Sequence, residues 1–280
     1  MLKSSIGIFF YFILQNRFVW KLLSNQEKNF ILKVNKSYNN SRDDYNINDY
    51  QSGYNFEKAK MLDFDDYRTY WGLIQDFFRD NNKVIKNICE IGPGSGYYTS
   101  KIIQTYNINY YLGIELNHNF IKYLKKNLDK TNIKKYDIID NFNSILKNKF
   151  DLMFFISSLH HIPDREYIFS FLNRHINPGG YIFIIEPTHY FPRICRLFFK
   201  FIRLYRFKKY YEDAKNLSTH HFLTYKEVEI LAKKFSFNII DVKYFKFPFF
   251  FKKYFDKNSL VPLVLKKYFS DEFFLLLQRK

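Results

Sequence analysis

The chain has 280 residues with 44 Lys and Arg against 27 Asp and Glu, a formal net charge of +17. Its hydrophobic content of 47% excludes an intrinsically disordered chain, and its length provides for one large or two modest domains with a buried core. Such a positive balance is typical of proteins that bind nucleic acid, anionic membranes or acidic substrates, but the codon bias of an AT-rich genome also enriches Lys, Asn and Ile. Most of the excess charge lies in residues 190–280, and codon bias does not explain that clustering.

The chain contains two cysteines, Cys89 and Cys195, which are too few for a disulfide framework. We therefore expect a reducing, cytoplasmic setting.

The N-terminal region begins with an apolar run, residues 5–14, that is shorter than the roughly 20 residues needed to cross a bilayer. No small-residue cleavage site follows it, so a signal peptide is disfavoured. Either an interfacial anchor or a core helix fits the run. Residues 63–80 show helical periodicity just before the first predicted strand.

From residue 84 the chain alternates short apolar runs with stretches of helical period. The runs predict strands at 84–91, 109–116, 133–139, 150–157 and 180–186. Helical periodicity lies between them, for example at 119–128 and 165–176. Nearly continuous hydrophobic strands joined by helices indicate a doubly wound parallel sheet with helices on both faces.

Three glycines follow the first of these strands, at Gly92, Gly94 and Gly96. At the first strand-to-helix turn of such a sheet, glycines let a ligand approach the backbone amides. The spacing does not match a phosphate-binding loop with Lys-Ser or Lys-Thr, and the third glycine comes one residue too early for a dinucleotide fingerprint. Glu90, at the end of a buried strand, needs a partner, which a cationic ligand group would supply.

Five stretches in order resemble the motifs of class I S-adenosylmethionine-dependent methyltransferases. They are "CEIGPGSGYYT", "YLGIEL", "YDIIDNF", "FDLMFFISSLHHIPD" and "LNRHINPGGYIFIIEP". Together they cover residues 84–187. This resemblance implies a Rossmann-like sheet of about seven strands with an antiparallel last strand, and S-adenosyl-L-methionine as the cofactor.

The resemblance also implies cofactor-binding residues. They are Glu90, Gly92, Gly94, Gly96, Glu115, Leu116, Asp140, Asn141 and Ser157. Glu115 matches the acidic residue that holds the ribose hydroxyls, and Asp140 with Asn141 lies where the adenine is contacted. Plainer interpretations stay open, because Glu115 can be a solvated strand end and Asp140 or Asn141 can cap a helix starting near Phe142.

The adjacent histidines His160 and His161 lie beside the expected methyl-transfer centre. Either can take a proton from a substrate hydroxyl or amine, and His161 is the preferred candidate. Alternatively, one packs under the loop, because a reactive nucleophile needs no base. We predict no metal site, since five of the histidines (His160, His161, His189, His220 and His221) have no zinc-ligand spacing with either cysteine.

Residues 224–247 predict a capped helix and a strand, and residues 271–280 predict the final, antiparallel strand. Two insertions, at 190–215 and 248–270, are rich in aromatic and basic residues. Within the first, 193–206 is a basic amphipathic pattern that fits an anionic membrane surface, a phosphate-binding lid or an ordinary solvated helix. In related proteins the helix before the glycine strand packs beside the cofactor cleft, so Tyr54, Tyr67 and Tyr70 either face the ligand or simply pack.

The sequence thus predicts an N-terminal helical extension over 1–83 and a methyltransferase domain over 84–280 with lid insertions. The predicted reaction is methyl transfer to an oxygen or nitrogen of a small-molecule or lipid-linked acceptor, in the cytoplasm or peripherally at a membrane. RNA or DNA is a less favoured acceptor, because no recognition module is visible. The remaining alternatives are a nicotinamide-dependent oxidoreductase and a non-catalytic membrane-associated binding protein.

Overall fold

A computed structural model describes residues 64–81, 85–94, 96–116, 118–142, 148–162, 164–188, 223–245 and 272–280, together with Lys267 and Ser270. Its helices are α6 (Phe64–Asn81), α7 (Tyr97–Thr105), α8 (His118–Leu128), the 3-10 helix η3 (Leu159–His161), α9 (Arg165–His175) and α12 (Tyr225–Lys234). Its strands are β1 (Asn87–Ile91), β2 (Tyr110–Ile114), β3 (Lys135–Ile139), β4 (Phe150–Ile156), β5 (Ile176–Pro187), β6 (Phe237–Phe245) and β7 (Glu272–Arg279).

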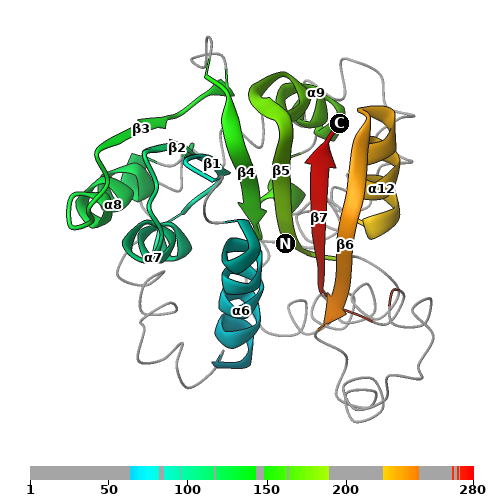
Figure 1. Cartoon of the computed structure of the whole chain (residues 1–280), viewed down its shortest axis with the longest axis horizontal. Coiled ribbons are helices and arrows are strands. Elements are labelled where there is room, and N and C mark those ends of the chain that lie inside the picture. Colours follow the sequence, from blue (N-terminus) through cyan, green and yellow to red (C-terminus); the bar gives the residue numbers. More distant parts are fainter. Residues whose placement is uncertain are drawn as a thin grey trace, which may run out of the picture.

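The seven strands form one sheet in the order β3-β2-β1-β4-β5-β7-β6. Neighbouring strands from β3 to β5 pair in parallel, whereas β7 pairs antiparallel with both β5 and β6 (Figure 1). The predicted doubly wound sheet with an antiparallel last strand is therefore confirmed.

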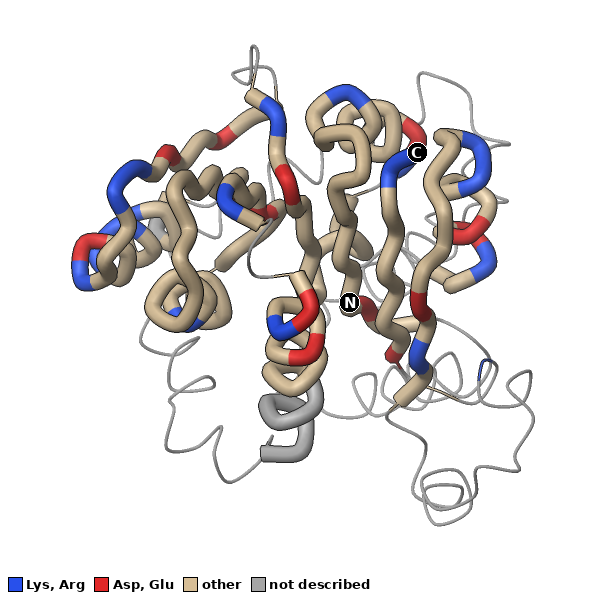
Figure 2. The backbone as a smooth tube through the Cα atoms, viewed as in Figure 1, with Lys and Arg blue, Asp and Glu red and all other residues tan. Residues whose placement is uncertain are grey.

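Helices cover both faces of the sheet, as the continuous apolar strands predict (Figure 1). Within β1, Cys89 and Ile91 belong to the core shared with α9 and α12, while Ile88 belongs to the core shared with α6, α7 and α8. Charged residues gather on α6, α8, α12 and the strand ends, and the bodies of the central strands carry almost none (Figure 2). Two buried layers therefore hold the sheet between its helices.

The two helices on the α9 and α12 face begin at side-chain caps. Asp164 accepts a hydrogen bond from the amide of Tyr167, and Thr224 accepts one from the amide of Glu227. Each bond satisfies an amide that the first helical turn leaves without a partner. The cap at Thr224 agrees with the capped helix predicted there.

The fifth strand was predicted to begin at residue 180, whereas β5 begins at Ile176 and includes the Pro178-Gly179-Gly180 stretch. The register against β4 shifts between Phe150 and Leu152, and Gly179 has a φ of 75°. The stretch is thus an irregularity inside a longer strand, where glycine supplies the left-handed backbone that the shift requires.

One edge of the sheet collects strand ends from distant parts of the chain. The parallel strands all end there, and the antiparallel β7 begins there, with Glu272 paired to Pro187 of β5 and Phe245 of β6. In open sheets of this kind, ligands bind outside the carboxyl ends of the strands. This edge is therefore the place to look for a site.

Several sequence predictions lie outside the described residues, including the apolar run 5–14, the basic pattern 193–206 and almost all of the insertion at 248–270. Among the helices that the structure describes, none has the length and apolarity needed to cross a membrane.

A buried ion pair joins the first turns of α9 and α12, with Arg165 Nη1 2.9 Å from Glu227 Oε1. Removing one partner from a buried pair leaves an uncompensated charge, so Glu227→Leu should lower the free energy of unfolding by about 3 kcal/mol. The double variant Arg165→Leu/Glu227→Leu should lose less, as measured by urea denaturation. A double variant at least as unstable as the single one would contradict this account.

Candidate functional site

The glycine loop joins β1 to α7 with its three glycines in left-handed conformations, at φ values of 73° for Gly92, 56° for Gly94 and 74° for Gly96. The amide of Gly92 donates to Ile114 O at 2.9 Å, and the amide of Gly96 donates to Pro93 O at 3.0 Å. The first bond holds the loop against the end of β2, and the second closes a turn within the loop. Residues with a Cβ atom are sterically disfavoured at such angles, and glycine is not.

The three glycines differ in what surrounds them. A Cβ on Gly92 would lie 2.6 Å from Ser158 Cβ, and one on Gly96 would collide with Leu124 Cδ1. A Cβ on Gly94 would meet no atom within 4 Å among the described residues. Gly92 and Gly96 are thus required for packing inside the protein, and only Gly94 borders open space that a ligand can enter.

Glu115 lies directly after β2 and contacts the loop. Its Oε2 accepts a hydrogen bond of 2.9 Å from the amide of Gly94, and the residue is 9% exposed. The next side chain, Leu116, is 60% exposed. The sequence placed Glu115 and Gly94 in one site, and the structure brings them into contact.

Glu90 lies beneath the loop on the face covered by α7, and it is 3% exposed. Its Oε2 accepts hydrogen bonds from the hydroxyls of Thr99 and of Tyr111, the latter at 3.3 Å. Burial raises the pKa of Glu90 from 4.5 to about 8, although these two hydrogen bonds oppose the rise. The sequence predicted that Glu90 needs a partner, but it did not identify these hydroxyls.

Asp140 and Asn141 follow β3 at the same edge, and both are exposed. Asn141 Nδ2 donates to Asp140 Oδ1 at 2.8 Å. The amide of Glu115 donates to Ile139 O at 2.9 Å, so the end of β3 lies directly beside Glu115. These residues were alternatively expected to cap a helix starting near Phe142, and residues 143–147, where that helix would continue, lie outside the described residues.

The turn after β4 begins at Ser157, an exposed residue with a φ of 54°. A non-glycine residue in this conformation carries backbone strain, and such strain concentrates at functional sites. The amide of Ser157 donates to Ile185 O at 2.8 Å, and the hydroxyl of Ser158 donates to Ile91 O. The turn is therefore fixed between β5 on one side and β1 on the other.

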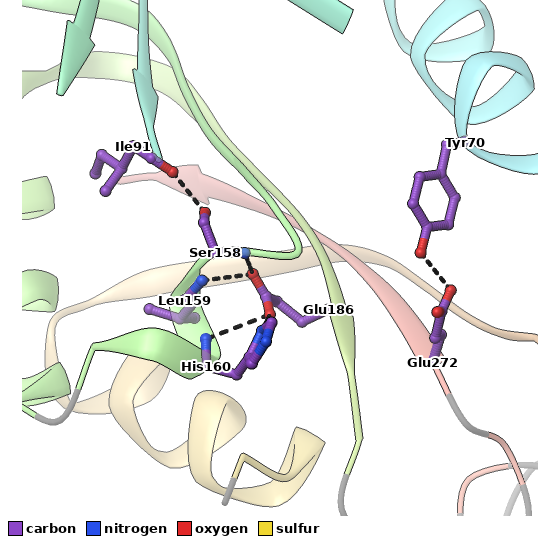
Figure 3. Close-up of polar contacts among 7 residues, drawn as sticks. All are labelled: Tyr70, Ile91, Ser158, Leu159, His160, Glu186 and Glu272. Carbon is purple, nitrogen blue, oxygen red and sulfur yellow. Dashed lines mark hydrogen bonds and ion pairs between the residues drawn. The ribbon is translucent and has the colours of Figure 1, made fainter. Parts of the chain in front are cut away.

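Glu186, near the end of β5, accepts hydrogen bonds from the backbone of this turn (Figure 3). Its Oε1 accepts hydrogen bonds of 2.6 Å from the amides of Ser158 and Leu159, and its Oε2 accepts one of 3.3 Å from the amide of His160. The side chain is fully buried. Burial raises its pKa to about 8, against the opposing effect of the three amides and of Arg165.

The two histidines differ in their surroundings. His160 is 4% exposed, and its Nδ1 lies 2.7 Å from Glu186 Oε2, whereas His161 is exposed. Their rings lie 4.1 Å apart and are inclined by 39°. The sequence preferred His161 as a base, but the imidazole paired with a carboxylate is that of His160.

A second buried pair joins α6 to the start of β7, where the hydroxyl of Tyr70 donates to Glu272 Oε2 at 2.5 Å (Figure 3). The ring of Tyr70 also lies 5.9 Å from those of Tyr98 and Phe245. Of the three candidate tyrosines, Tyr70 is thus at the ligand edge. Tyr54 and the side chain of Tyr67 lie outside the described residues.

Sequence reasoning missed Glu186 although the signal was present. A carboxylate at the end of an apolar strand singled out Glu90, and the same pattern occurs at the end of β5. The Tyr70–Glu272 pair gave no signal, since its members are separated by 202 positions. The residues His189, His220, His221 and Cys195 lie outside the described residues. Among the described residues, no group of three or more His, Cys, Asp or Glu side chains is placed to hold a metal.

Comparison with known proteins identifies the family. The family described as "Methyltransferase domain" matches residues 64–242, which is more than half of the chain. The chain belongs to the class I S-adenosylmethionine-dependent methyltransferases. It is therefore an enzyme that uses S-adenosyl-L-methionine, and the nicotinamide-dependent alternative is wrong.

A curated relative of the methyltransferase is malonyl-[acyl-carrier protein] O-methyltransferase 2 of Ilyobacter polytropus, 25% identical over 134 residues. The match covers 46% of the chain and about half, 50%, of the relative's length. A solved S-adenosylmethionine-dependent methyltransferase from Clostridium acetobutylicum aligns with a TM-score of 0.55 at 14% identity, covering 82% of this chain and 98% of that one. The cyclopropane synthase MmaA2 from Mycobacterium tuberculosis aligns with a TM-score of 0.51 at 15% identity, covering 69% and 78%. These structural likenesses establish the shared fold.

The site of the methyltransferase has the features that the cofactor needs. Gly94 borders open space. The carboxylate of Glu115 lies beside it and can accept hydrogen bonds from hydroxyl groups, and Leu116 offers an exposed apolar surface. A carboxylate oxygen can accept more than one hydrogen bond, so the contact with the Gly94 amide does not occupy Glu115 fully.

The raised pKa values of Glu90 and Glu186 predict how stability depends on pH. Each group has a pKa of about 8 in the folded protein against 4.5 as the reference, so between these values the unfolded chain has lost a proton that the folded protein keeps. The free energy of unfolding should therefore fall from pH 4.5 to pH 8. Urea denaturation at several pH values should show a shallower fall in Glu90→Gln. The exposed α6 acid Asp76 provides the control Asp76→Asn, which should keep the wild-type slope.

The different surroundings of Gly94 and Gly96 predict different defects in alanine variants. Gly96→Ala introduces a collision with Leu124 and should cost more stability than the 1–2 kcal/mol typical of left-handed strain alone. Gly94→Ala should remain folded and bind S-adenosylmethionine at least about tenfold more weakly, a loss of roughly 1.4 kcal/mol. Thermal unfolding and titration calorimetry measure the two effects. Equal cofactor affinity in Gly94→Ala and wild type would contradict the assignment of the open space.

Proposed function

We propose that this methyltransferase transfers its methyl group to an oxygen or nitrogen of a small-molecule or lipid-linked acceptor. The observation that carries the proposal is the turn after β4, where the His160–Glu186 pair lies at the same edge as Gly94. A polar turn with an imidazole suits an acceptor that loses a proton as it is methylated. The curated relative in Ilyobacter polytropus is an O-methyltransferase by name, which supports an oxygen acceptor.

We propose that the cofactor is held by the residues the family motifs mark: Glu90, Gly92, Gly94, Gly96, Glu115, Leu116, Asp140, Asn141 and Ser157. Glu115 receives the ribose hydroxyls, and the strand end at Asp140 and Asn141 borders the adenine. Gly92 and Gly96 act indirectly, by allowing the loop to pack on Ser158 and Leu124.

S-adenosylmethionine supplies an electrophilic methyl group on a sulfonium sulfur. The protein then has to align the acceptor, exclude water and receive a proton. The cofactor would supply its methyl carbon to the acceptor's electron pair, and the electrons of the broken carbon–sulfur bond would stay on sulfur. The acceptor's O–H or N–H bond breaks, and we propose that one of the two histidines, His160 or His161, takes the proton.

We propose that the acceptor site extends into the two insertions. We propose that residues 1–83 form a helical extension to a methyltransferase domain over 84–280, and that 190–215 and 248–270 cover the acceptor. The excess positive charge of the last third supports a cytoplasmic protein that binds an anionic membrane surface peripherally through 193–206.

Incubation with cofactor labelled in its methyl group tests this function directly. The purified full chain would be offered three acceptor pools: small hydroxy, carboxy and amino compounds, including carrier-bound acyl groups; lipid extracts in anionic vesicles; and total RNA and DNA. We expect label in the first or second pool and none in nucleic acid. Gly94→Val, which places a branched side chain in the cofactor space, should abolish the transfer. Label confined to nucleic acid would overturn the proposal.

A further inference from the structure

The solvent face of α8 carries three lysines that no acid neutralises. Lys122, Lys125 and Lys126 are all exposed, and they are spaced so that the second and third follow the first by three and four positions. Within the described residues, none of the ion pairs involves any of the three. Like charges at this spacing destabilise a helix. The stability of α8 therefore does not account for them.

The basic surface continues beyond the end of the helix towards β3. We call the following exposed residues the α8 lysine surface: Lys122, Lys125, Lys126, Lys130 and Lys134. The acids of this region are engaged elsewhere, because Asp129 Oδ1 accepts the hydroxyl of Tyr136 at 2.5 Å and Asp137 Oδ2 accepts that of Tyr110 at 2.8 Å. The positive charge of the surface is thus left for a partner.

The helix α12 shows that the composition of the chain is not the reason. It is also rich in lysine, but Lys226 and Lys233 contact the two oxygens of Glu229 at 3.0 Å and 2.8 Å, and Lys234 contacts Glu166 at 2.8 Å. Codon bias acts on both helices alike. It does not explain why lysines are paired with acids on one helix and left without them on the other.

We propose that the α8 lysine surface binds an anionic lipid bilayer. This inference rests on the proposed function, and it adds a contact separate from the one proposed through 193–206. Residues 118–135 contain six lysines and no arginine. A lysine ammonium is a compact, hydrated charge on a flexible stem, which suits attraction to fluid headgroups, whereas bidentate phosphate recognition in nucleic acids relies on arginine.

The aromatic residues of this region also favour lipid over nucleic acid. Proteins that bind single strands stack bases on aromatic rings. The aromatic residues within 118–135 are Phe120 and Tyr123, and both are half-buried. The exposed part of the surface offers charge without a stacking platform.

The position of α8 fits a membrane-bound acceptor. The helix begins at His118, two residues after Leu116 at the ligand edge, and its buried Leu124 and Leu128 belong to the core beneath it. Figure 2 shows its positive charge at one side of the molecule. A bilayer against this side therefore borders the ligand edge, where a lipid-linked acceptor is needed.

Co-sedimentation of the full chain with vesicles tests the surface. Vesicles of phosphatidylcholine with phosphatidylserine should bind the protein, and vesicles of phosphatidylcholine alone should not. The triple variant Lys122→Gln/Lys125→Gln/Lys126→Gln should bind the anionic vesicles at least about tenfold more weakly, because each lysine near such a surface contributes to the attraction. Added salt should weaken the wild type, since it screens these charges.

The matched control is Lys226→Gln/Lys233→Gln/Lys234→Gln, which removes the same charge from α12. Its lysines are already paired, so its affinity should stay within about twofold of the wild type. Equal losses in the two triple variants would mean that only net charge matters and would overturn the proposal. The α8 variant loses a like-charge repulsion, so thermal unfolding should show it at least as stable as the wild type.

Other outcomes separate this surface from the function on which it rests. Failure of the wild type to bind anionic vesicles overturns the surface, as does binding to total RNA that the α8 variant loses while vesicle binding stays unchanged. Methyl transfer to a small or lipid-linked acceptor without vesicle binding overturns the surface alone. Vesicle binding that depends on the α8 lysines, with label confined to nucleic acid, supports the surface and overturns the proposed function.

Discussion

The ligand edge depends on the hydrogen bonds between the Glu186 carboxylate and the turn after β4. They fix the amides of Ser158 and Leu159, and Ser158 in turn binds Ile91 O and fills the space beside Gly92. The glycine loop can pass this point only because Gly92 lacks a Cβ. A single buried side chain on β5 thus sets the position of the turn, and the turn restricts the residue that the loop after β1 can carry at position 92 to glycine.

This arrangement has an energetic cost that the rest of the fold must offset. Glu90 and Glu186 are both buried near strand ends, and burial raises the pKa of each to about 8. Two extensive apolar layers, one on each face of the sheet, supply the compensating stability. Stability is therefore concentrated in the body of the sheet, while its carboxyl edge retains groups that a structure selected for stability alone would replace.

The sequence predicted most of the fold because the strands are uninterrupted apolar runs and the helices carry the 3.6-residue period. The cap at Thr224 was predicted for the same reason, since it depends on local pattern, whereas the antiparallel last strand was predicted from the resemblance to the methyltransferase family. The start of the fifth strand was predicted too late, because a turn and a bulge both use glycine at positive φ and only the pairing with β4 distinguishes them at Gly179. Pairing register is a property of two strands, so one strand's sequence does not contain it.

The same distinction divides the site. Glu90, the glycines and Glu115 lie within 26 residues of one another and form a motif that sequence can detect. The other side of the edge is assembled from α6, the turn after β4, β5 and β7, so that Tyr70 meets Glu272 and His160 meets Glu186. In the proposed function the compact motif serves the cofactor, whose chemistry is common to the family, and the other side of the edge serves the acceptor, which has to vary. Elements drawn from distant parts of the chain can change one at a time without disturbing the cofactor loop, which is a physical reason for the two halves to be encoded so differently.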